Sequence, residues 1–485
     1  MKIACVQLQP GLPTFWDIVP APRYGTLAIA SALRQAGFDV LGLVENISTN
    51  IEEECAKADI VAFTILSACA EKTYRLADNL RERNKIVLFG GCHANYFLED
   101  SLRHCDYVVL GDGEGTLIDL VNGLCTSKAV DKIPGIAWLE DGGVRQNPRE
   151  QSPVRFKGRV DLTLIKDYPA FIRRRRWLGW SPVLFQATRG CPFDCKFCIT
   201  REMFGKEYYM REVEEAVDDL KDKLRYSKDI YFVDNNFGGN IKYTRRLVEA
   251  FLREKIAMNA TAYVRHEFSR QSDLLRMMRK AGFSRLLVGI ESFVDGTLNE
   301  LEKHQNFKSV QESIKIFRRY GFRTSGTFIM GVGEWETRAT AGKYLDVARR
   351  LKLDYAFFFI YCVYPQMCDE YLPKERVFLN DLNYGTGHFI FFFPKNIPPS
   401  QLQHELIRSH IAFYSRSRIL SRFLSGRWKE VVELILHRRL FLRLRPHIEE
   451  YENYLRELEE GLYKDESLDI EALRKKEIVK LPCYR

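Results

Sequence analysis

Several patterns that mark other classes of protein are missing from this chain of 485 residues. It has no run of eighteen apolar residues, so we predict no membrane-spanning helix. Its first residues, MKIACVQLQP, contain neither a basic region nor an apolar core, so we predict no signal peptide and expect a cytoplasmic protein. Most of the twelve cysteines are scattered singly, without the spacing of a disulfide framework, which indicates reduced thiols.

The composition is that of a globular protein with more than one domain. Hydrophobic residues make up 46% of the chain and charged residues 28%, and the length exceeds one ordinary core, which predicts two or three domains. The formal charge of +9 is partly local, because ten Lys and Arg accompany three Glu between Gln401 and Arg445. Such a segment either meets an anionic partner or forms a solvated helical face.

The exception among the cysteines is ATRGCPFDCKFCIT, residues 187–200, with Cys191, Cys195 and Cys198. Three thiols this close can bind one metal centre. A structural zinc site needs four ligands, and no second Cys or His pair follows within the next sixty residues. In a cubane 4Fe-4S cluster, three cysteines leave one iron open to a small molecule, which favours a reactive cluster here.

The spacing C-x3-C-x-aromatic-C, with Phe197 as the aromatic residue, resembles the motif of the radical S-adenosylmethionine superfamily. The resemblance implies that S-adenosylmethionine binds the open iron through its amine and carboxylate. One electron from the cluster would then release a 5'-deoxyadenosyl radical, which takes a hydrogen atom from a substrate. An electron donor such as flavodoxin or ferredoxin is implied as well.

Residues 1–145 alternate apolar strands and amphipathic helices, which predicts a Rossmann-like, doubly wound parallel sheet. The predicted strands are KIACVQL, VLGLVE, DIVAFTIL, KIVLFGG and YVVLGDGE. Ligands of such sheets bind beyond the carboxyl ends of the strands. The small and polar residues expected there are Thr64, Ser67, Gly90, Gly91, Gly111, Gly113 and Glu114. Glycines also punctuate any fold of this kind, so alone they do not establish a ligand site.

Together with the cysteine motif, LFGGCHANYFLED and VVLGDGEGTLIDL make this domain resemble the cobalamin-binding domain of cobalamin-dependent radical S-adenosylmethionine enzymes. The resemblance implies that these seven residues contact cobalamin. No D-x-H-x-x-G motif occurs, so the implied cobalamin has no His ligand on cobalt. The alternative is a vestigial domain that packs against the rest and binds nothing.

Residues 183–371 contain six strand and helix repeats, which favours a partial (β/α)6 TIM-type barrel with its active site at the carboxyl ends of the strands. Residues 146–182 are predicted to be a linker, and residues 372–485 a mostly helical C-terminal domain. Aromatic runs such as AFFFIYCVY favour core packing or the lining of a hydrophobic substrate site. Three further thiols are either buried or ligands of a second cluster, namely Cys362, Cys368 and Cys483.

The resemblance places the S-adenosylmethionine site at the mouth of this barrel. The residues expected there are Phe197, Asp234, Asn235, Asn236, Arg265, Glu291, Gly326 and Gly331. VDNNF is similar to the Asp-Asp-x-Phe element of cobalamin-dependent members, so its side chains would bond the methionyl amine. Arg265 would pair with the carboxylate and Glu291 would accept from the ribose, while the two glycines would admit the adenine. For the polar residues the alternative is a hydrogen-bond network internal to the barrel mouth.

These resemblances imply an enzyme that methylates an unactivated carbon of a small substrate, such as a hydrophobic lipid or tetrapyrrole. Methylcobalamin would deliver the methyl group, and a second S-adenosylmethionine would restore it. One alternative is a radical cyclase that forms a ring without methyl transfer. Another is a sensor that binds nucleic acid, but no recognition-helix or finger motif occurs, so we expect no nucleic-acid partner. The basic C-terminal segment is consistent with peripheral contact with an anionic membrane.

Overall fold

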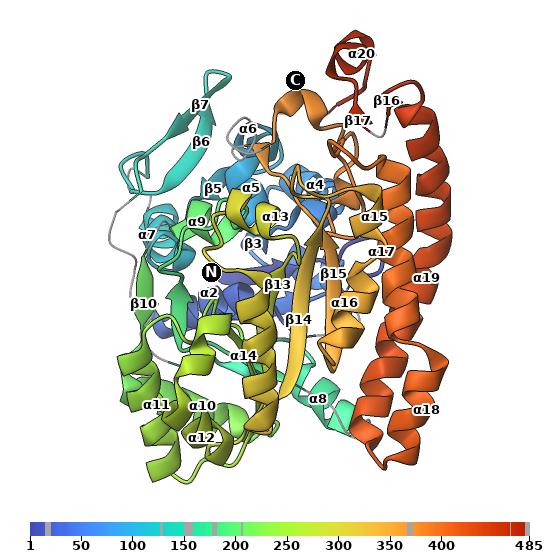
Figure 1. The fold of residues 1–485 in the computed structure, drawn as a ribbon. Coiled ribbons are helices and arrows are strands. Elements are labelled where there is room, and N and C mark those ends of the chain that lie inside the picture. The colour runs from blue at the N-terminus through green and yellow to red at the C-terminus, as the bar shows by residue number, and fades with distance from the viewer. Residues whose placement is uncertain are drawn as a thin grey trace.

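The computed structural model describes residues 1–14, 21–126, 130–149, 159–176, 182–204, 207–365, 372–465 and 467–480. It contains two large sheets that are mainly parallel, one in the amino-terminal domain and one in a central half-barrel. Long C-terminal helices cover one flank of the half-barrel (Figure 1). No helix within the described ranges is long and apolar enough to cross a membrane.

The amino-terminal domain contains the parallel sheet predicted from the sequence. Its strand order is β2-β1-β3-β4-β5-β6-β7. The five predicted strands are parallel neighbours, and they are β1 (Lys2–Gln7), β2 (Asp39–Val44), β3 (Ile60–Thr64), β4 (Ile86–Gly90) and β5 (Tyr107–Val109). Their near-continuous burial reflects helices packed on both faces, which is why the strands are apolar throughout.

The helices of this domain are α2 (Tyr24–Gln35), α3 (Ile51–Ala56), α4 (Ala70–Glu82), α5 (Cys92–Tyr96), α6 (Leu98–Leu102) and α7 (Gly113–Thr126). An antiparallel hairpin at the sheet edge, which the sequence did not predict, comprises β6 (Ile136–Glu140) and β7 (Gly143–Gln146). The expected linker is partly helical, because α8 (Tyr168–Arg176) lies within it.

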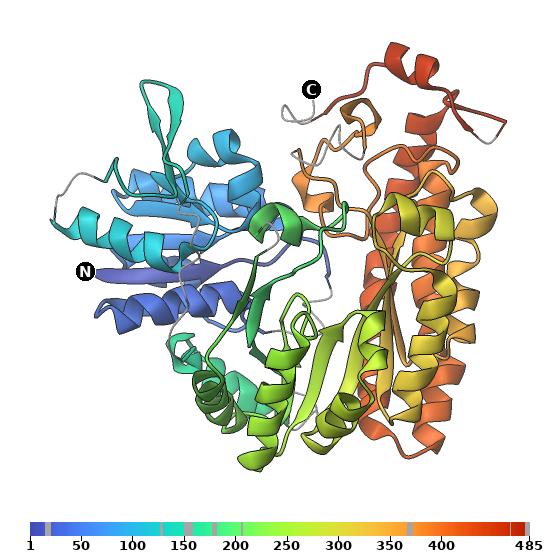
Figure 2. The same ribbon diagram turned by 60° about the vertical axis from the view of Figure 1, so that its left-hand side comes forward.

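The central domain has six parallel strands in the order β15-β14-β13-β12-β11-β8, as predicted. They are β8 (Val183–Phe185), β11 (Asp229–Phe232), β12 (Asn259–Val264), β13 (Phe283–Glu291), β14 (Arg323–Met330) and β15 (Tyr355–Ile360). The helices outside the sheet are α10 (Val213–Leu224), α11 (Ile241–Arg253), α12 (Ser272–Lys280), α13 (Asp295–Glu300), α14 (Phe307–Arg319), α15 (Arg338–Ala341) and α16 (Tyr344–Arg350). Figure 2 shows this curved sheet beside the amino-terminal domain.

The C-terminal region is mainly helical, as predicted. It contains α17 (Pro399–Phe413), α18 (Arg416–Leu424), α19 (Trp428–Glu459), a short hairpin of β16 (Tyr463–Lys464) and β17 (Ser467–Leu468), and α20 (Ile470–Lys475). Helix α17 packs against the edge strand β15. There the His410 ring lies 2.7 Å from the carbonyl of Phe358, and Tyr414 donates a 2.8 Å hydrogen bond to the carbonyl of Ala356. These contacts cover one side of the half-barrel and leave the side toward the first domain for a ligand site.

Candidate cofactor-binding site

The cysteine loop, Cys191–Cys198, lies between β9 (Thr188–Gly190) and α9 (Ile199–Phe204). Strand β9 pairs with β10 (Tyr208–Met210), so the loop and α9 are enclosed by a small antiparallel pair. Asn235 spans the two ends of the loop, because its Oδ1 accepts from Gly190 N at 3.1 Å and its Nδ2 donates to Thr200 Oγ1 at 3.1 Å. Asn235 thus holds the loop in shape from the neighbouring strand end.

Two cations approach the thiols of this loop. Cys195 is buried, and its Sγ lies 3.6 Å from Nη1 of Arg265. Burial raises the pKa of both Cys191 and Cys195, while Arg265 opposes the rise at both thiols and Lys303 opposes it at Cys195. Because thiolates are the ligands of iron-sulfur clusters, nearby cations favour the charged form that a cluster requires.

The three cysteines provide a donor set suited to a cluster. Among the described residues, no three His, Cys, Asp or Glu side chains converge as the ligands of one metal ion would. The cysteines of a cubane each bind a different iron atom and therefore stand farther apart than the ligands of a single ion. One loop with three thiols, flanked by Arg265 and Lys303, is compatible with that larger group.

The carboxylate of Asp234 is not free for a ligand, because it is hydrogen-bonded to other residues of the protein. Its Oδ1 accepts from Thr188 N at 2.5 Å and Thr188 Oγ1 at 2.6 Å, and Ala187 N also donates to it at 3.2 Å. Burial raises the pKa of Asp234 to about 6, although these hydrogen bonds oppose the rise. Asp234 therefore secures the strand that leads into the cysteine loop, which is a role the sequence reasoning did not assign to it.

Within the VDNNF segment, the side-chain oxygen of Asn236 is the hydrogen-bond acceptor that best suits a ligand. Its side-chain Oδ1 is buried and has no hydrogen-bond partner among the described residues. A buried amide oxygen without a donor is unfavourable by about 1–3 kcal/mol, so a bound amine would satisfy it. This orphaned atom fits the sequence-based expectation that VDNNF bonds the methionyl amine of S-adenosylmethionine.

Arg265 and Glu291, the other expected polar contacts, are already paired in the structure. Arg265 forms a 2.8 Å ion pair with Glu267, and the central carbon of its guanidinium group lies 4.0 Å from the centroid of the Phe193 ring. Glu291 accepts from Lys303 Nζ at 2.7 Å. Although burial alone would raise the pKa of Glu267, hydrogen bonds from His266 and Arg265 hold it well below its usual range.

Lys303 is a residue of this network that sequence reasoning missed. Its ammonium lies 5.4 Å from the ring centroid of Phe197, the aromatic residue of the cysteine motif, and its carbonyl accepts from Arg265 at 2.6 Å. Burial lowers its pKa, but Glu291 and Cys195 outweigh burial and raise it. No local pattern around LEKHQ marks this lysine, because its partners come from distant strands.

The two glycines expected near the adenine have packing roles in the structure. Gly326 lies inside β14, where an added Cβ would come within 2.6 Å of Ile290 and 2.7 Å of Leu353. Gly331 follows the strand with φ +74°, and a Cβ there would stand 2.1 Å from Leu402 of α17. Gly326 is therefore a core position and not a strand-end position, which the sequence pattern alone could not distinguish.

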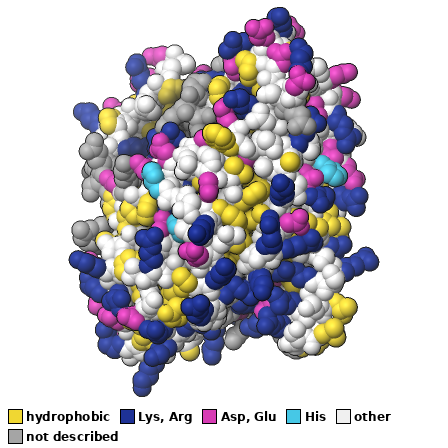
Figure 3. Space-filling view, viewed as in Figure 1, with side chains coloured by type: hydrophobic (Ala, Val, Ile, Leu, Met, Phe, Trp, Pro, Cys, Tyr) yellow, Lys and Arg dark blue, Asp and Glu magenta, His cyan; other side chains and the backbone are white. Residues whose placement is uncertain are grey.

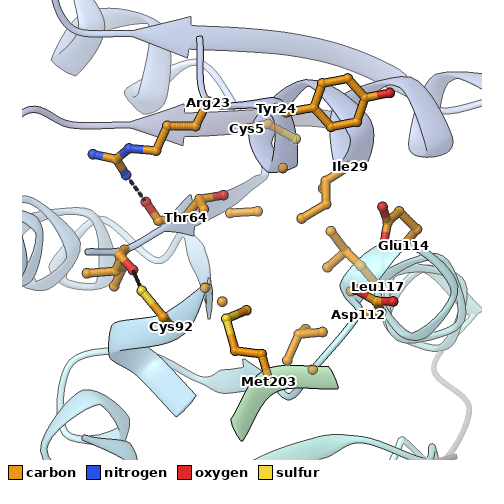
Figure 4. Close-up of a pocket in the computed structure, with 18 of the residues that line it drawn as sticks. Cys5, Arg23, Tyr24, Ile29, Thr64, Cys92, Asp112, Glu114, Leu117 and Met203 are labelled. Atoms are coloured by element: carbon orange, nitrogen blue, oxygen red, sulfur yellow. Dashed lines mark hydrogen bonds between the residues drawn. The ribbon is translucent and has the colours of Figure 1, made fainter. Parts of the chain in front are cut away.

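A cavity of about 420 Å³ lies between the amino-terminal domain and the barrel, within the size range of cofactor pockets. We call it the interdomain cavity. Six of the seven residues predicted for the first ligand site line it: Thr64, Gly90, Gly91, Gly111, Gly113 and Glu114. Figure 4 shows Cys5 and Ile29 on its first-domain side and Met203 of α9 reaching in from the barrel side. The cavity thus brings the strand ends of one domain close to the helix that follows the cysteine loop.

The seventh predicted residue, Ser67, has a different environment. It is buried, its Oγ lies 3.1 Å from Nδ1 of His93, and it is not among the residues that line the cavity. Burial lowers the pKa of His93 to about 3, and its other nitrogen lies 2.8 Å from the hydroxyl of Tyr74. The Nδ1 atom of His104 lies 2.9 Å from Oδ2 of Asp78. Neither histidine is among the described residues that line the interdomain cavity.

Backbone geometry explains why glycines occur at the cavity rim. Gly91 has φ 92° and ψ 174°, a conformation almost restricted to glycine, and an added Cβ would lie 2.9 Å from the carbonyl oxygen of Ile65. Gly111 has φ +72°. The chain therefore turns sharply after β4 and after β5, and these turns form the wall of the cavity without side chains to fill it.

Arg189 joins the two halves of the site. It precedes the first cysteine by two residues, and it forms a two-pronged ion pair with Glu114 at 2.7 and 3.2 Å and a second ion pair with Asp112 at 3.0 Å. The side chains of this triad are at most 15% exposed. Burial opposes the charge on Arg189, but both carboxylates raise its pKa further above its ordinary value. Glu114 is thus engaged by the barrel, a pairing that its position in GDGEG does not reveal.

Cys362 lies two residues beyond the end of β15, and burial raises its pKa to about 12. The other two cysteines proposed for a second cluster, Cys368 and Cys483, lie outside the described residues. A thiol with so high a pKa stays protonated at neutral pH and behaves as a small apolar group.

The comparisons with known proteins agree with this architecture. Residues 185–341 match the family model of the radical SAM superfamily, and residues 20–121 match that of the B12 binding domain. Both matches fall on the two domains that enclose the interdomain cavity.

Among curated proteins, an uncharacterized methyltransferase of Pyrococcus horikoshii is 28% identical over 82% of this chain and 89% of its own. The bacteriochlorophyllide d C-12(1)-methyltransferase of Chlorobaculum tepidum is 24% identical over 85% of this chain and 87% of its own. Proteins named anaerobic magnesium-protoporphyrin IX monomethyl ester cyclase are similar as well, at 22–25% identity.

A solved structure of the cobalamin-dependent S-adenosylmethionine radical enzyme OxsB shares the fold with a TM-score of 0.67 and 15% identity, covering 98% of this chain and 78% of that one. The chain matches both family models, it carries the three-cysteine loop, and it shares its fold with OxsB over nearly its whole length. We conclude that this chain belongs to the radical S-adenosylmethionine enzymes that carry a cobalamin-binding domain.

Proposed function

We propose that this enzyme transfers a methyl group to an unactivated carbon of a small hydrophobic substrate. The observation that carries the proposal is the interdomain cavity, which is lined by Gly91 and Gly111 of the first domain and by Met203 and Asn235 of the barrel. When bound, the cluster and S-adenosylmethionine supply a hydrogen-abstracting radical, and cobalamin supplies a transferable methyl group. A cavity next to the cysteine loop suits the short transfer that this chemistry needs.

In this proposal the residues of the chain hold the reacting groups in place. Cys191, Cys195 and Cys198 would bind the 4Fe-4S cluster, and the unpaired Oδ1 of Asn236 would accept from the amine of S-adenosylmethionine. Asn235 keeps the ends of the cysteine loop together. These contacts are preorganised by backbone hydrogen bonds, so binding does not have to order the loop.

The first-domain residues would hold cobalamin mainly by shape. Thr64, Gly90, Gly91 and Gly113 line the cavity with backbone and small side chains, and aliphatic groups such as Leu117 complete the wall. A flat, largely apolar ring fits such a surface better than a small charged ligand would. A one-electron donor such as flavodoxin or ferredoxin belongs to the proposal, since the radical reaction consumes electrons that the chain itself does not supply.

The substrate is proposed to be a tetrapyrrole or a polycyclic lipid. One of the similar proteins is named for methylation of a bacteriochlorophyllide, which is a flat hydrophobic ring system. Its similarity extends over 85% of this chain and therefore includes both cofactor domains. A ring-forming reaction without methyl transfer is the second candidate, because cyclases are among the similar proteins.

The test is an anaerobic reaction of the protein reconstituted with iron, sulfide and hydroxocobalamin, in the presence of reductant, methyl-labelled S-adenosylmethionine and an added tetrapyrrole or polycyclic lipid. Methyl transfer predicts 5'-deoxyadenosine, S-adenosylhomocysteine and label in a tetrapyrrole or polycyclic lipid product. A product that lacks the label while 5'-deoxyadenosine accumulates would favour the cyclase. The Cys198→Ala variant is the matched control, because it should form none of these products.

A further inference from the structure

Four large apolar side chains project from the end of the molecule formed by α18 and the start of α19. Their exposed fractions are 55% for Leu420, 45% for Phe423, 76% for Leu424 and 59% for Trp428. We call these four residues the apolar tip. Figure 3 shows hydrophobic side chains over α18 at the lower right, with Lys and Arg side chains beside them. Single exposed apolar residues are common, but four adjacent ones mark an interaction site.

The tip is held in an ordered position by the opposite face of α18. Arg418 donates to the carbonyls of Leu353 and Asp354 at 2.6 and 3.0 Å, which fixes α18 to the amino end of β15. The rings of Phe423 and Trp428 meet edge to face with centroids 4.6 Å apart. The chain therefore presents these apolar groups to solvent on a fixed scaffold instead of folding them into the core.

The segment that carries the tip is basic, and most of its cations have acidic partners. Five Lys and Arg and no acidic residue occur from Ser415 to Lys429. Arg422 and Arg427 both form ion pairs with the buried Glu430, at 3.1 and 3.8 Å respectively. Within the part of the chain that the structure describes, no acidic side chain pairs with the exposed residues Arg416, Arg439 and Arg443.

We propose that the apolar tip and Arg416, which is on the same helix, dock the enzyme on an anionic lipid bilayer. Aromatic and Leu side chains at the tip would enter the headgroup region, where Trp is favoured, while Arg416 meets a lipid phosphate. A nucleic acid would use the cations but not four apolar side chains. The core of a protein interface is depleted in charged residues, whereas Arg416 lies on the same nine-residue helix as Leu420 and Leu424.

The tip lies far from the cofactors along the barrel. It is attached at the amino end of β15, while the cysteine loop and the interdomain cavity lie at the carboxyl ends of the strands. Docking would thus hold the enzyme at a membrane with its cofactor end turned away from the bilayer. This inference does not depend on the reaction proposed above.

The test is co-sedimentation of the full chain with vesicles of phosphatidylcholine alone or mixed with phosphatidylglycerol. We expect binding to the mixed vesicles only. The Leu420→Ser/Leu424→Ser/Trp428→Ser variant should bind at least about tenfold more weakly, and Arg416→Gln about fivefold more weakly. The control is Leu139→Ser/Val144→Ser on the β6–β7 hairpin, whose side chains are 41% and 39% exposed and which should bind like the unchanged protein.

Because the substituted side chains are exposed, unfolding of the variants is not expected, and circular dichroism will verify this. Absence of binding to mixed vesicles, or equal binding by the apolar-tip variant, would overturn the proposal. It would also be overturned if the variant changed a dimer into a monomer in gel filtration without any loss of vesicle binding. Competition of duplex DNA against vesicles at physiological salt, with the same loss in the Arg416→Gln variant only, would assign the surface to nucleic acid instead.

Discussion

The first-domain wall of the interdomain cavity and the mouth of the barrel that faces it use their polar groups in different ways. The wall is made of backbone turns at Gly91 and Gly111 and of aliphatic side chains. The mouth is crowded with charged groups that are already paired, such as Lys303 with Glu291. A large neutral ring is held by shape, whereas a small charged cofactor needs preorganised polar groups, and the two sides differ accordingly.

The largest expected effect concerns the mouth of the barrel. Replacing Cys195 by Ala removes one of three proposed cluster ligands, so we expect loss of the iron-sulfur absorption and of all 5'-deoxyadenosine formation, because no other side chain in the loop can replace a thiolate. Absorption spectroscopy and a chromatographic assay measure both. Cys125→Ala is the control, since Cys125 is exposed on α7 and should change neither quantity. Turnover by Cys195→Ala would contradict the cluster assignment.

The second prediction concerns the ion pairs of Arg189 with Glu114 and Asp112, which connect the two regions. Arg189→Met would leave Glu114 and Asp112 buried without a countercharge, which should cost about 3–5 kcal/mol of stability and release cobalamin during gel filtration. Thermal unfolding is the measurement.

Two matched variants make that result specific. Arg145→Met removes an exposed pair with Glu140 and should cost less than about 1 kcal/mol. Arg189→Met/Glu114→Gln should recover part of the loss, because the double change removes a buried uncompensated charge. If Arg189→Met unfolded at the same temperature as Arg145→Met, the ion pairs of Arg189 would not be needed to hold the two domains together.

The third prediction separates shape from stability on the cavity wall. Gly91→Ala should destabilise the protein by about 1–3 kcal/mol and weaken cobalamin retention, because its backbone conformation excludes a side chain. Gly25→Ala, in α2 at the cavity edge, meets no atom within 4 Å and should keep the melting temperature or raise it slightly. Gly25→Leu should reduce cobalamin retention alone by filling the cavity. Equal cobalamin retention in all three variants would show that this wall does not contact the ring.

The same contrast explains what the sequence could predict. The parallel strands, the cysteine loop and the glycine turns of the cavity are local patterns, so their spacing predicts them. The pairings at the barrel mouth are not local: Asp234 bonds Thr188, 46 positions away, and Arg189 meets Glu114, 75 positions away. Residue type alone could not show that Asp234 and Glu291 would already have partners within the protein.

Two further differences have the same cause. Gly326 was expected at a ligand because it precedes a strand end, but strand β14 continues past it to Met330, so packing against Ile290 explains the glycine. The β6–β7 hairpin was missed because β7, with the sequence GVRQ, is exposed along its whole length and lacks an apolar pattern; it is held by pairing with β6 at the sheet edge.

The last prediction concerns the pH dependence of stability and Glu336, which lies beyond the carboxyl end of β14. Burial raises the pKa of Glu336 to about 7, although hydrogen bonds from Tyr344, the Gly331 amide and Ser292 oppose the rise. The folded state therefore binds a proton that the unfolded chain releases near pH 4.5, so stability should fall as pH rises from about 5 to 7, by up to roughly 3 kcal/mol. Glu336→Gln removes this titration, and its melting temperature relative to the unchanged protein should be higher at pH 8 than at pH 5. Parallel pH profiles of the two proteins would mean that Glu336 is ionised throughout, and that the barrel mouth keeps its carboxylates charged even where they are most deeply buried.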